Sequence, residues 1–471
     1  MASISSPGIA SGLDIQSIVS QLVALEKAPL TQLKSQATSF QTRLSTMGTI
    51  KSQVAALGDA TAKLSKNTGW DAVKATSSNP LAIGVTVKAG APATSITMEV
   101  QNLAKAQSTS SAAVPAGTAM GTGSMTIELG QWSGSSFAAG SGTPVTIDID
   151  AGDDTLAKIA AKINESGAGV SATVLKDASG ERLLMRSKET GEENAFRITV
   201  ADDDGQDTDA GGLSRLAFSV GNANGMSRSQ NAENALATIN NVSISSASNT
   251  LSDTLPGMTL QLSQETTGPV EIDVSNDTAA ISANVKAFVD AYNTLNTTLA
   301  TATRYDEATK TAGPLQGDST TVGLQNALRG MMRSVSSSTP YSRLSDVGIE
   351  LKSGGKLEID ATKMGAALDN LDDLKALFTT TGSDPTAVGF GWKIKTFAEG
   401  LIDSDGTVTN KTDALQASIK RNTLDQERVN DKAARSEKRL LAQYNAMDAS
   451  VGKLNSLSAF VSQQISMWNK G

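Results

Sequence analysis

The stretch Leu440–Gly471, LLAQYNAMDASVGKLNSLSAFVSQQISMWNKG, repeats apolar residues at steps of four and three. Its only charged residues are Asp448, Lys453 and Lys470. The first 33 residues share this character, with only Asp14, Glu26 and Lys27 charged. A solvated helix normally carries Lys and Glu on its outer face, so a stripe flanked by Ser, Gln, Thr and Asn is typical of a helix packed among neighbours. Both ends therefore predict terminal helices that join an assembly.

Helical periodicity extends inward from both ends. Asp14 is a good N-cap, and the first helix has an apolar stripe of Ile15, Ile18, Val19, Leu22 and Leu25. Pro29 suits the first position of a second helix, whose stripe continues to Leu64. At the other end, a long helix is expected from Thr412 to the end of the chain. The two ends therefore predict one shared helical stalk.

Between the ends, apolar residues first recur at every second position, as in a strand, and then again at every third or fourth position, as in a helix. Strands are expected around Ile83–Val87, Ile96–Val100, Val145–Ile149, Val170–Leu175, Arg182–Arg186, Phe196–Val200, Thr238–Ile244 and Met258–Leu262. Residues 107–144, rich in Gly, Ser and Ala, predict loops and short exposed strands, and Leu156–Ile163 predicts one helix. From Thr278, further helices are expected around residues 281–299, 324–332 and 371–378, with a small strand at Leu357–Ile359.

The fold class predicted is α+β and multidomain. A long helical coiled-coil stalk from both termini and a helical leg domain carry a mainly antiparallel β head of two lobes. The expected segments are terminal helix arms at 1–40 and 435–471, leg parts at 41–75 and 278–434, an inner head lobe at 76–107 and 225–277, and an outer lobe at 108–224.

Composition excludes several classes of function. The chain of 471 residues has no cysteine and no histidine, which excludes disulfides, thiolate nucleophiles, Cys/His zinc sites and triads with a His base. The net charge of −8 argues against nucleic acid and anionic membranes as partners. No run reaches the roughly 18 apolar residues of a membrane span, and the N-terminus lacks the features of a secretory signal peptide. No phosphate loop or nucleophile elbow is present, so we expect no enzyme, cofactor or resident metal.

The acidic run Asp202–Asp207 raises a calcium hypothesis. Placing Gly205 at position six of a twelve-residue calcium loop puts Val200 at position one and Gly211 at position twelve, and neither has a carboxylate. A solvated β-turn is the preferred interpretation. Asp403–Gly406 is likewise interpreted as a turn before the last helix.

The apolar stripes of the stalk have two interpretations. They can pair within one chain, which we prefer for Phe40–Leu64 and for the highly charged stretch Lys420–Arg439. For residues 1–33 and 440–471 we prefer packing between subunits, because removing charge contributes nothing to a solvated coiled coil.

Several motifs resemble the flagellar filament cap family, hook-associated protein 2. The run Ile4–Asp14 is similar to the opening signature of that family, and Ser11–Asp14 is its most specific piece. Val100–Gln107, Asn240–Ile244 and Leu255–Leu260 resemble the segments that enter and leave its head, and Ala291–Asn293 and Gly317–Ser319 its C-terminal region. Thr155–Gly191 is similar to an inserted module that some flagellins and hook proteins share.

The resemblance implies a protein exported unfolded through the flagellum, without a cleaved signal peptide, to the distal tip. There a closed ring, often a pentamer, would retain exported flagellin, prevent its leakage and promote its folding and polymerisation. The partners implied are further copies of the chain, flagellin, the hook–filament junction protein, a cytoplasmic export chaperone and the flagellar type III export apparatus. The residues expected to contact the filament or another subunit are Leu13, Ile15, Ile18, Leu22, Leu25, Val451 and Leu454. Those expected to contact the chaperone are Leu454, Leu457, Val461, Ile465 and Trp468.

Two other functions remain open from the sequence. A flagellin or a hook–filament junction protein shares helical ends and a β centre, although Ser11–Asp14 and the charged helix at Lys420–Arg439 favour the cap. Closed rings would distinguish a cap from the open filaments of a flagellin. A secreted hydrolase with a carboxylate pair in the β head is the third alternative, and nothing in the sequence places such a pair in a cleft.

Overall fold

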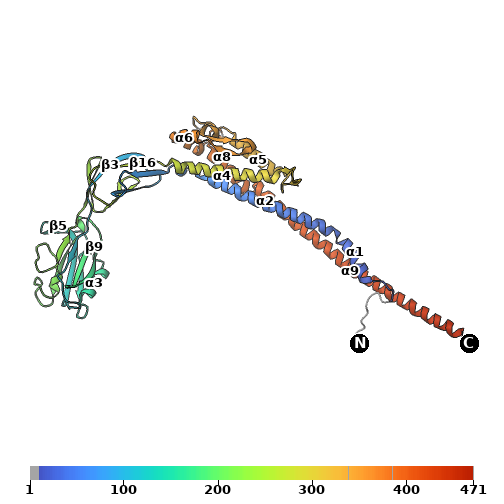
Figure 1. Ribbon diagram of the computed structural model, residues 1–471, viewed down its shortest axis with the longest axis horizontal. Helices are drawn as coiled ribbons and strands as arrows, with labels where there is room; N and C mark the ends of the chain where they lie inside the picture. Colours follow the sequence, from blue (N-terminus) through green and yellow to red (C-terminus); the bar gives the residue numbers. More distant parts are fainter. Residues whose placement is uncertain (1–9, 338, 385, 470–471) are drawn as a thin grey trace. The chain divides into compact units, whose positions relative to one another are not determined.

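The computed structural model describes residues 10–337, 339–384 and 386–469, which form two compact units. One unit combines the residues up to Trp70 with those from Ala279 onward and is mainly helical. The other, Asp71–Thr278, consists mainly of antiparallel sheets (Figure 1). This confirms the predicted α+β class with helices from both ends of the chain. Residues 4–9 of the predicted opening signature lie outside the described residues.

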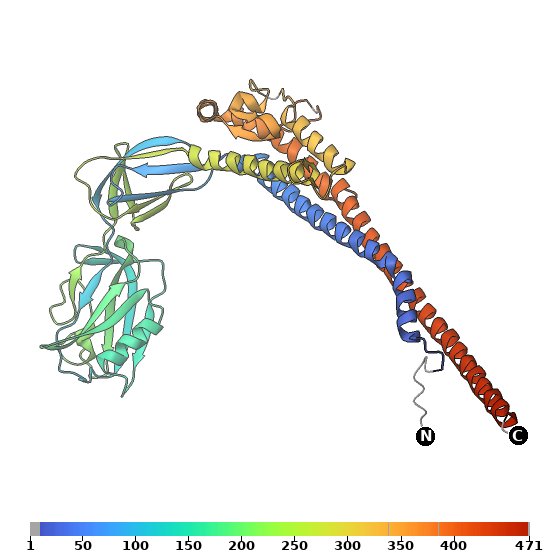
Figure 2. The ribbon, with the colours of Figure 1, turned by 45° about the vertical axis from the view of Figure 1, so that its right-hand side comes forward.

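Three helices build the stalk of the helical unit: α1 (Ile15–Glu26), α2 (Ala28–Leu64) and α9 (Thr407–Trp468). Both α1 and α2 pack along α9, although they come from the opposite end of the sequence (Figure 2). Within α2, the buried positions follow the predicted four-three pattern: Met47, Ile50, Val54, Leu57, Thr61 and Leu64. Helix α9 begins earlier than the predicted Thr412, directly after the turn at Asp403–Gly406.

A single residue, Lys27, separates α1 from α2. It ends the first helix and caps the second, and Pro29 lies within the first two positions of α2. Proline has no N–H to donate to the preceding turn, and its ring crowds that turn, so one continuous helix is disfavoured here. The sequence places this boundary correctly.

A polar residue is buried in the seam between α2 and α9. Asn422 is 4% exposed, and its Nδ2 donates to the Leu33 carbonyl at 3.0 Å. Its Oδ1 accepts from Gln426 Nε2 at 2.7 Å. Because sliding one helix along the other would leave the amide unpaired, Asn422 fixes the register of the two helices.

The remaining helices of this unit pack around α2 and α9. They are α4 (Thr278–Thr303), α5 (Ser319–Met332), α6 (Ala361–Asp369), α7 (Leu371–Thr379) and α8 (Phe390–Ile402). The sequence pattern predicts α4, α5 and α7, but not α6 and α8. Helix α8 lies very close to the end of α2, since a Cβ on Gly391 would be 2.9 Å from the Ser65 Cα. Nearby, the rings of Trp70 and Phe378 lie 5.3 Å apart between centroids.

Two small hairpins complete the helical unit: β17 (Tyr305–Asp306) with β18 (Thr311–Ala312), and β19 (Ile349–Leu351) with β20 (Leu357–Ile359). Glu350 on β19 accepts hydrogen bonds from Lys352 at 2.6 Å and from Lys363 at 2.7 Å. These two lysines lower the pKa of Glu350 to about 2.

The β unit contains two separate cores. The inner core lies between two sheets whose strand orders are β1-β16-β3-β12-β13 and β14-β15-β2. The strands are β1 (Val73–Ser77), β2 (Ile83–Val87), β3 (Thr94–Asn102), β12 (Ala235–Ile239), β13 (Val242–Ser246), β14 (Thr250–Leu255), β15 (Met258–Leu262) and β16 (Val270–Asn276). Alternate residues of β3, Ile96, Met98 and Val100, enter this core as the period of two predicts.

The predicted strand region Thr238–Ile244 contains a tight turn. Asn240 and Asn241 have φ of +48° and +64° and join β12 to β13. A two-residue loop with positive φ at both positions matches the right-handed twist of a hairpin, and asparagine tolerates that conformation. Asn240 Oδ1 also accepts from the Thr97 backbone N–H at 2.9 Å.

The outer core is built from two four-stranded sheets and one helix. One sheet has the order β10-β5-β6 with β7 also on β5, and the other has the order β11-β4-β9-β8. The elements are β4 (Ser108–Ser110), β5 (Gly123–Ser133), β6 (Ser136–Ala139), β7 (Val145–Ile149), α3 (Leu156–Glu165), β8 (Val170–Asp177), β9 (Gly180–Ser187), β10 (Ala195–Asp202) and β11 (Ser227–Gln230). Helix α3 packs on β8.

The prediction of loops and short exposed strands for residues 107–144 is wrong at β5. This strand has 11 residues, pairs with β10, β6 and β7, and buries Met125 and Ile127. Its Gly130 is required by a close approach, because a Cβ there would lie 2.2 Å from the Ala138 carbonyl oxygen. Glycine and serine lower strand propensity, but here the pairing partners determine the strand.

The acidic run is a turn, as preferred from the sequence. The Gly205 N–H donates to the Asp202 carbonyl at 3.0 Å. The Asp202 carboxylate is buried and accepts from the Ser214 backbone N–H at 2.9 Å. The carboxylate of Asp202 is therefore used to hold the loop to the chain.

Within residues 10–469, apart from 338 and 385, no helix has the length and apolarity needed to cross a bilayer. In the same residues, no three Cys, Asp or Glu side chains gather as metal ligands.

Candidate assembly surface

The first helix packs its inner face on α9 of the same chain. Ile15, Val19 and Val23 form a buried cluster with Ala433, and three side chains of α9 pack against that cluster: Leu440, Leu441 and Tyr444. Glu26 continues the seam, since its Oε1 accepts from Ser436 Oγ at 2.7 Å. The interpretation that stripes pair within one chain therefore applies to this inner face.

The residues predicted on α1 fall on two different faces. Ile15 is fully buried in the seam, whereas Ile18 and Leu22 are half-buried. Leu13 and Leu25 are 42% and 71% exposed. The predicted stripe omits Val23, which follows Ile15 and Val19 at steps of four and is 6% exposed. The outer residues of α1 thus remain open for another molecule.

The motif Ser11–Asp14 ties the start of the chain to α9. Asp448 Oδ1 accepts from the Ser11 backbone N–H at 2.8 Å and from Ser11 Oγ at 2.6 Å. Asn455 Nδ2 donates to the Ala10 carbonyl at 2.9 Å. We call residues 10–14 with Asp448, Gly452 and Asn455 the N-terminal clasp.

Backbone geometry explains the other residues of the N-terminal clasp. Gly12 has φ of +70°, a conformation that costs other residues more, and it turns the chain into α1. Asp14 then caps α1, accepting from the Ser17 N–H at 2.9 Å. Gly452 leaves room for the chain, because a Cβ there would lie 3.1 Å from the Ala10 Cβ. The cap at Asp14 confirms the sequence prediction.

Beyond the N-terminal clasp, α9 continues with large apolar side chains on its surface. We call these residues the distal apolar face: Leu454, Leu457, Phe460, Val461, Ile465, Met467 and Trp468, with exposed fractions from 46% to 88%. Four of them, Leu454, Val461, Ile465 and Trp468, continue the four-three stripe that packs on α1 at Leu440 and Tyr444. One stripe of α9 is therefore covered at its start and uncovered at its end.

The distal apolar face has the properties of an interaction surface. Lys453 is the one charged side chain among the described residues 449–469. An exposed apolar surface of this kind is typical of sites where another molecule binds. Its residues also share a helical face at steps of three and four, which is how a helix presents anchors to a groove.

The structure brings together only part of the predicted site. Val451 is half-buried near the N-terminal clasp, and Leu454 begins the distal apolar face. All five residues predicted to contact an export chaperone lie on that face. Sequence reasoning missed Phe460 and Met467, which also belong to this face, and Asp448, whose carboxylate accepts both hydrogen bonds from Ser11. The sequence does distinguish Asp448 in one way, because it is the only acidic residue between positions 440 and 471.

Sequence profiles of three families match the chain. The profile of the flagellar hook-associated protein 2 N-terminus matches residues 11–107, and that of its C-terminus matches residues 232–456. The profile of the flagellin hook IN motif matches residues 136–189, which include α3. Flagellar hook-associated protein 2 of Escherichia coli K12 is 34% identical over 98% of both chains. That of Salmonella typhimurium LT2 is 31% identical over the full length of both.

A solved structure is similar in fold as well. The D1-D2-D3 domains of the flagellar cap protein FliD from Escherichia coli superpose with a TM-score of 0.60 at 33% sequence identity. The match covers 79% of this chain and 99% of the solved one.

Proposed function

The chain belongs to the flagellar hook-associated protein 2 family, and we propose that it caps the growing flagellar filament. In this proposal it forms a closed ring of copies, a pentamer, at the distal tip outside the cell. The ring retains exported flagellin and promotes its folding and polymerisation. The distal apolar face carries the proposal, because a single chain leaves it uncovered at the end of the stalk.

The chemistry of this face suits a contact that must form and break repeatedly. Breaking a buried ion pair costs about 3–5 kcal/mol, because it leaves an uncompensated charge. Apolar contacts are small individually and separate without leaving a charge behind. Such contacts to the filament end and to neighbouring copies would come from Leu13, which precedes α1, from the outer face of α1 (Ile18, Leu22 and Leu25) and from the distal apolar face.

The same face suits an earlier partner in the cytoplasm. An exposed apolar helix risks aggregation before export, and a chaperone with a groove for Leu454, Leu457, Val461, Ile465 and Trp468 would cover it. Release of that chaperone at the flagellar type III export apparatus would then free the face for assembly, first beside the hook–filament junction protein.

The double variant Val461→Ser/Ile465→Ser tests the proposal. Both side chains are about half exposed, so the variant should keep the melting temperature of the wild type. Adding purified protein to cells that lack their own cap bypasses export, and filament length is then measured by electron microscopy. The wild type should restore filaments, whereas the double variant should not.

Gln463→Ser is the matched control, because Gln463 lies on the opposite side of the same helix and is also exposed. Filaments of normal length on the double variant would refute the role of the face. Images of the purified wild type should show closed rings of five copies. Open-ended filaments in those images would instead favour a flagellin or junction protein.

A further inference from the structure

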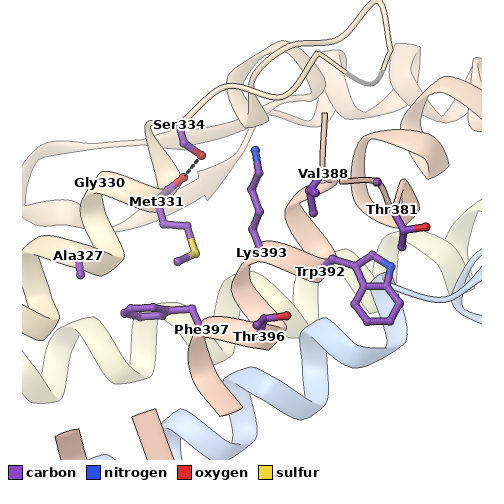
Figure 3. Close-up of a pocket in the computed structure, with 11 residues that line it drawn as sticks. Ala327, Gly330, Met331, Ser334, Thr381, Val388, Trp392, Lys393, Thr396 and Phe397 are labelled. Carbon is purple, nitrogen blue, oxygen red and sulfur yellow. Dashed lines mark hydrogen bonds between the residues drawn. The ribbon is translucent and has the colours of Figure 1, made fainter. Parts of the chain in front are cut away.

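The helical unit contains an apolar groove away from the distal apolar face. It has a volume of about 820 Å³ and is lined by residues of α5 and α8 and by Thr381, Gly382 and Val388. Met331 of α5 and Trp392 and Phe397 of α8 supply its large side chains, and Val388 borders it (Figure 3). We call this the α5–α8 groove. None of the interactions described for the stalk or the N-terminal clasp uses it.

Gly330 leaves part of the α5 wall of the α5–α8 groove without a side chain. A glycine inside a helix costs roughly 0.5–1 kcal/mol relative to alanine. A Cβ on Gly330 would meet no atom of the chain within 4 Å, so the packing of this protein does not require a glycine there. Ala327 of α5 and Ser334, which follows α5, also line the groove and are small as well. A missing side chain on a helix that borders an open groove allows the backbone of a partner to come close.

Lys393 supplies the charge of the groove. Among the described residues that line it, Lys393 alone is charged, and its side chain extends between α5 and α8 (Figure 3). Its Nζ donates to the Val335 carbonyl at 3.0 Å and lies 5.6 Å from the centroid of the Phe390 ring. Burial lowers the pKa of Lys393, and Asp384 nearby opposes this effect without forming an ion pair. A half-buried ammonium with a carbonyl and a ring as neighbours attracts a carboxylate.

We propose that the α5–α8 groove binds a helix of incoming flagellin, with apolar residues on one face and one carboxylate facing Lys393. Met331, Trp392 and Phe397 would receive the apolar residues, and Gly330 would allow the close approach. The inference rests on the proposed function, which makes flagellin the passing partner. It adds a binding site for flagellin on α5 and α8, separate from the distal apolar face.

The chain's own terminal helices fit the groove less well. The described part of the tail, residues 449–469, has no acidic side chain to place opposite Lys393. At the start of the chain, Asp14 caps α1 by accepting from the Ser17 N–H, and Glu26 of α1 accepts from Ser436 Oγ. Charge complementarity therefore favours another protein over the terminal helices of a second copy.

The test uses Gly330→Leu, which fills the groove from a position where the fold has room. Gly365→Leu in α6 is the matched control, because a Cβ on Gly365 also meets nothing within 4 Å and Gly365 does not line the groove. Both variants should keep or raise the melting temperature, since a helix interior favours leucine over glycine. Binding of full-length protein to purified flagellin monomer is measured by biolayer interferometry, and ring formation by mass photometry.

Gly330→Leu should weaken flagellin binding at least tenfold and leave ring formation intact, while Gly365→Leu changes neither. Lys393→Gln should weaken binding as well and make the remaining binding less sensitive to salt. Wild-type affinity in Gly330→Leu would overturn the inference. Loss of rings in that variant alone would overturn it too, because the groove would then bind a second copy. If the wild type itself neither binds flagellin nor supports filament growth, the proposed function fails instead.

Discussion

Removing the anchor of the N-terminal clasp should loosen α1 without unfolding the protein. In Asp448→Ala, Ser11 loses two hydrogen bonds to one carboxylate oxygen, at 2.8 Å from its backbone N–H and at 2.6 Å from its hydroxyl. A hydrogen bond to a charged group contributes about 1.5–3 kcal/mol when shielded. The clasp is only part-buried and both bonds share one acceptor, so we expect a loss of about 1.5–3 kcal/mol for the pair.

Native-state hydrogen exchange of the α1 amides measures this loss directly. The seam holds α1 through only three buried apolar side chains, so α1 should open locally while α2 and α4 stay folded. Since about 1.4 kcal/mol corresponds to a factor of ten, exchange in α1 should accelerate roughly 10- to 100-fold. Exchange in α4 should not change. Ser450→Ala is the matched control, because its hydroxyl bonds only to the Ala446 carbonyl of its own helix.

A double-mutant cycle tests whether the Ser11 hydroxyl acts through Asp448. Ser11→Ala removes only the hydroxyl bond and should cost about 1 kcal/mol. Once Asp448 is replaced by alanine, the Ser11 hydroxyl has lost its acceptor, so the double variant should behave like Asp448→Ala alone. Additive effects of the two substitutions, or unchanged protection of α1 in Asp448→Ala, would refute the clasp as the element that holds α1 in place.

Three further outcomes are expected. Leu57→Ala, at a fully buried position of α2, should lower the free energy of unfolding by about 2–5 kcal/mol in urea titrations, whereas Leu25→Ala, at an exposed position, should change it by under about 0.5 kcal/mol. Asn241→Gly should keep or raise the melting temperature of the β unit and Asn241→Val should lower it, because φ at this position is +64°. The pKa of Glu350 is lowered to about 2, so its stabilising contribution is complete above pH 4.5 and is lost as the pH falls towards 2. Glu350→Gln should therefore reduce the loss of stability in acid melts over that range, and an unchanged acid profile would contradict the assignment.

The sequence predicts the helices of this protein well where one face is buried by a long partner. The stripe from Met47 to Leu64 and the stripe of α4 keep helical spacing because α9 and the surrounding helices select the same face repeatedly. The sequence predicts β5 poorly, because its glycines and serines resemble a loop. Its burial arises from three partner strands that come later in the chain.

The candidate site was predictable in composition but not in geometry. A stripe without charges predicts that α1 and the end of α9 contact another helix or molecule, but not which face contacts which partner. Ile15 lies in the seam within the chain and Leu25 lies on the outside, although both belong to the same predicted stripe. Only the packing of Ala433, Leu440 and Tyr444 on α1 decides between them. Whether the exposed residues touch the filament, another copy or a chaperone stays a prediction.

The continuity of α9 explains how an uncovered helix can serve as a binding surface. A free helix as short as Leu454–Trp468 is marginal in water, because nucleating the first turn is unfavourable. Here the helix is nucleated far upstream, where α9 packs on α2 and α1, and the tail only propagates it. A partner therefore meets anchors that are already in helical register, which lowers the ordering cost of binding. The covered part of the stripe lies where Leu440 and Tyr444 pack on α1, and Met447 beyond them is already 38% exposed. Cover and exposure on one stripe are thus assigned by the place where α1 packs, and the N-terminal clasp holds the chain that leads into α1.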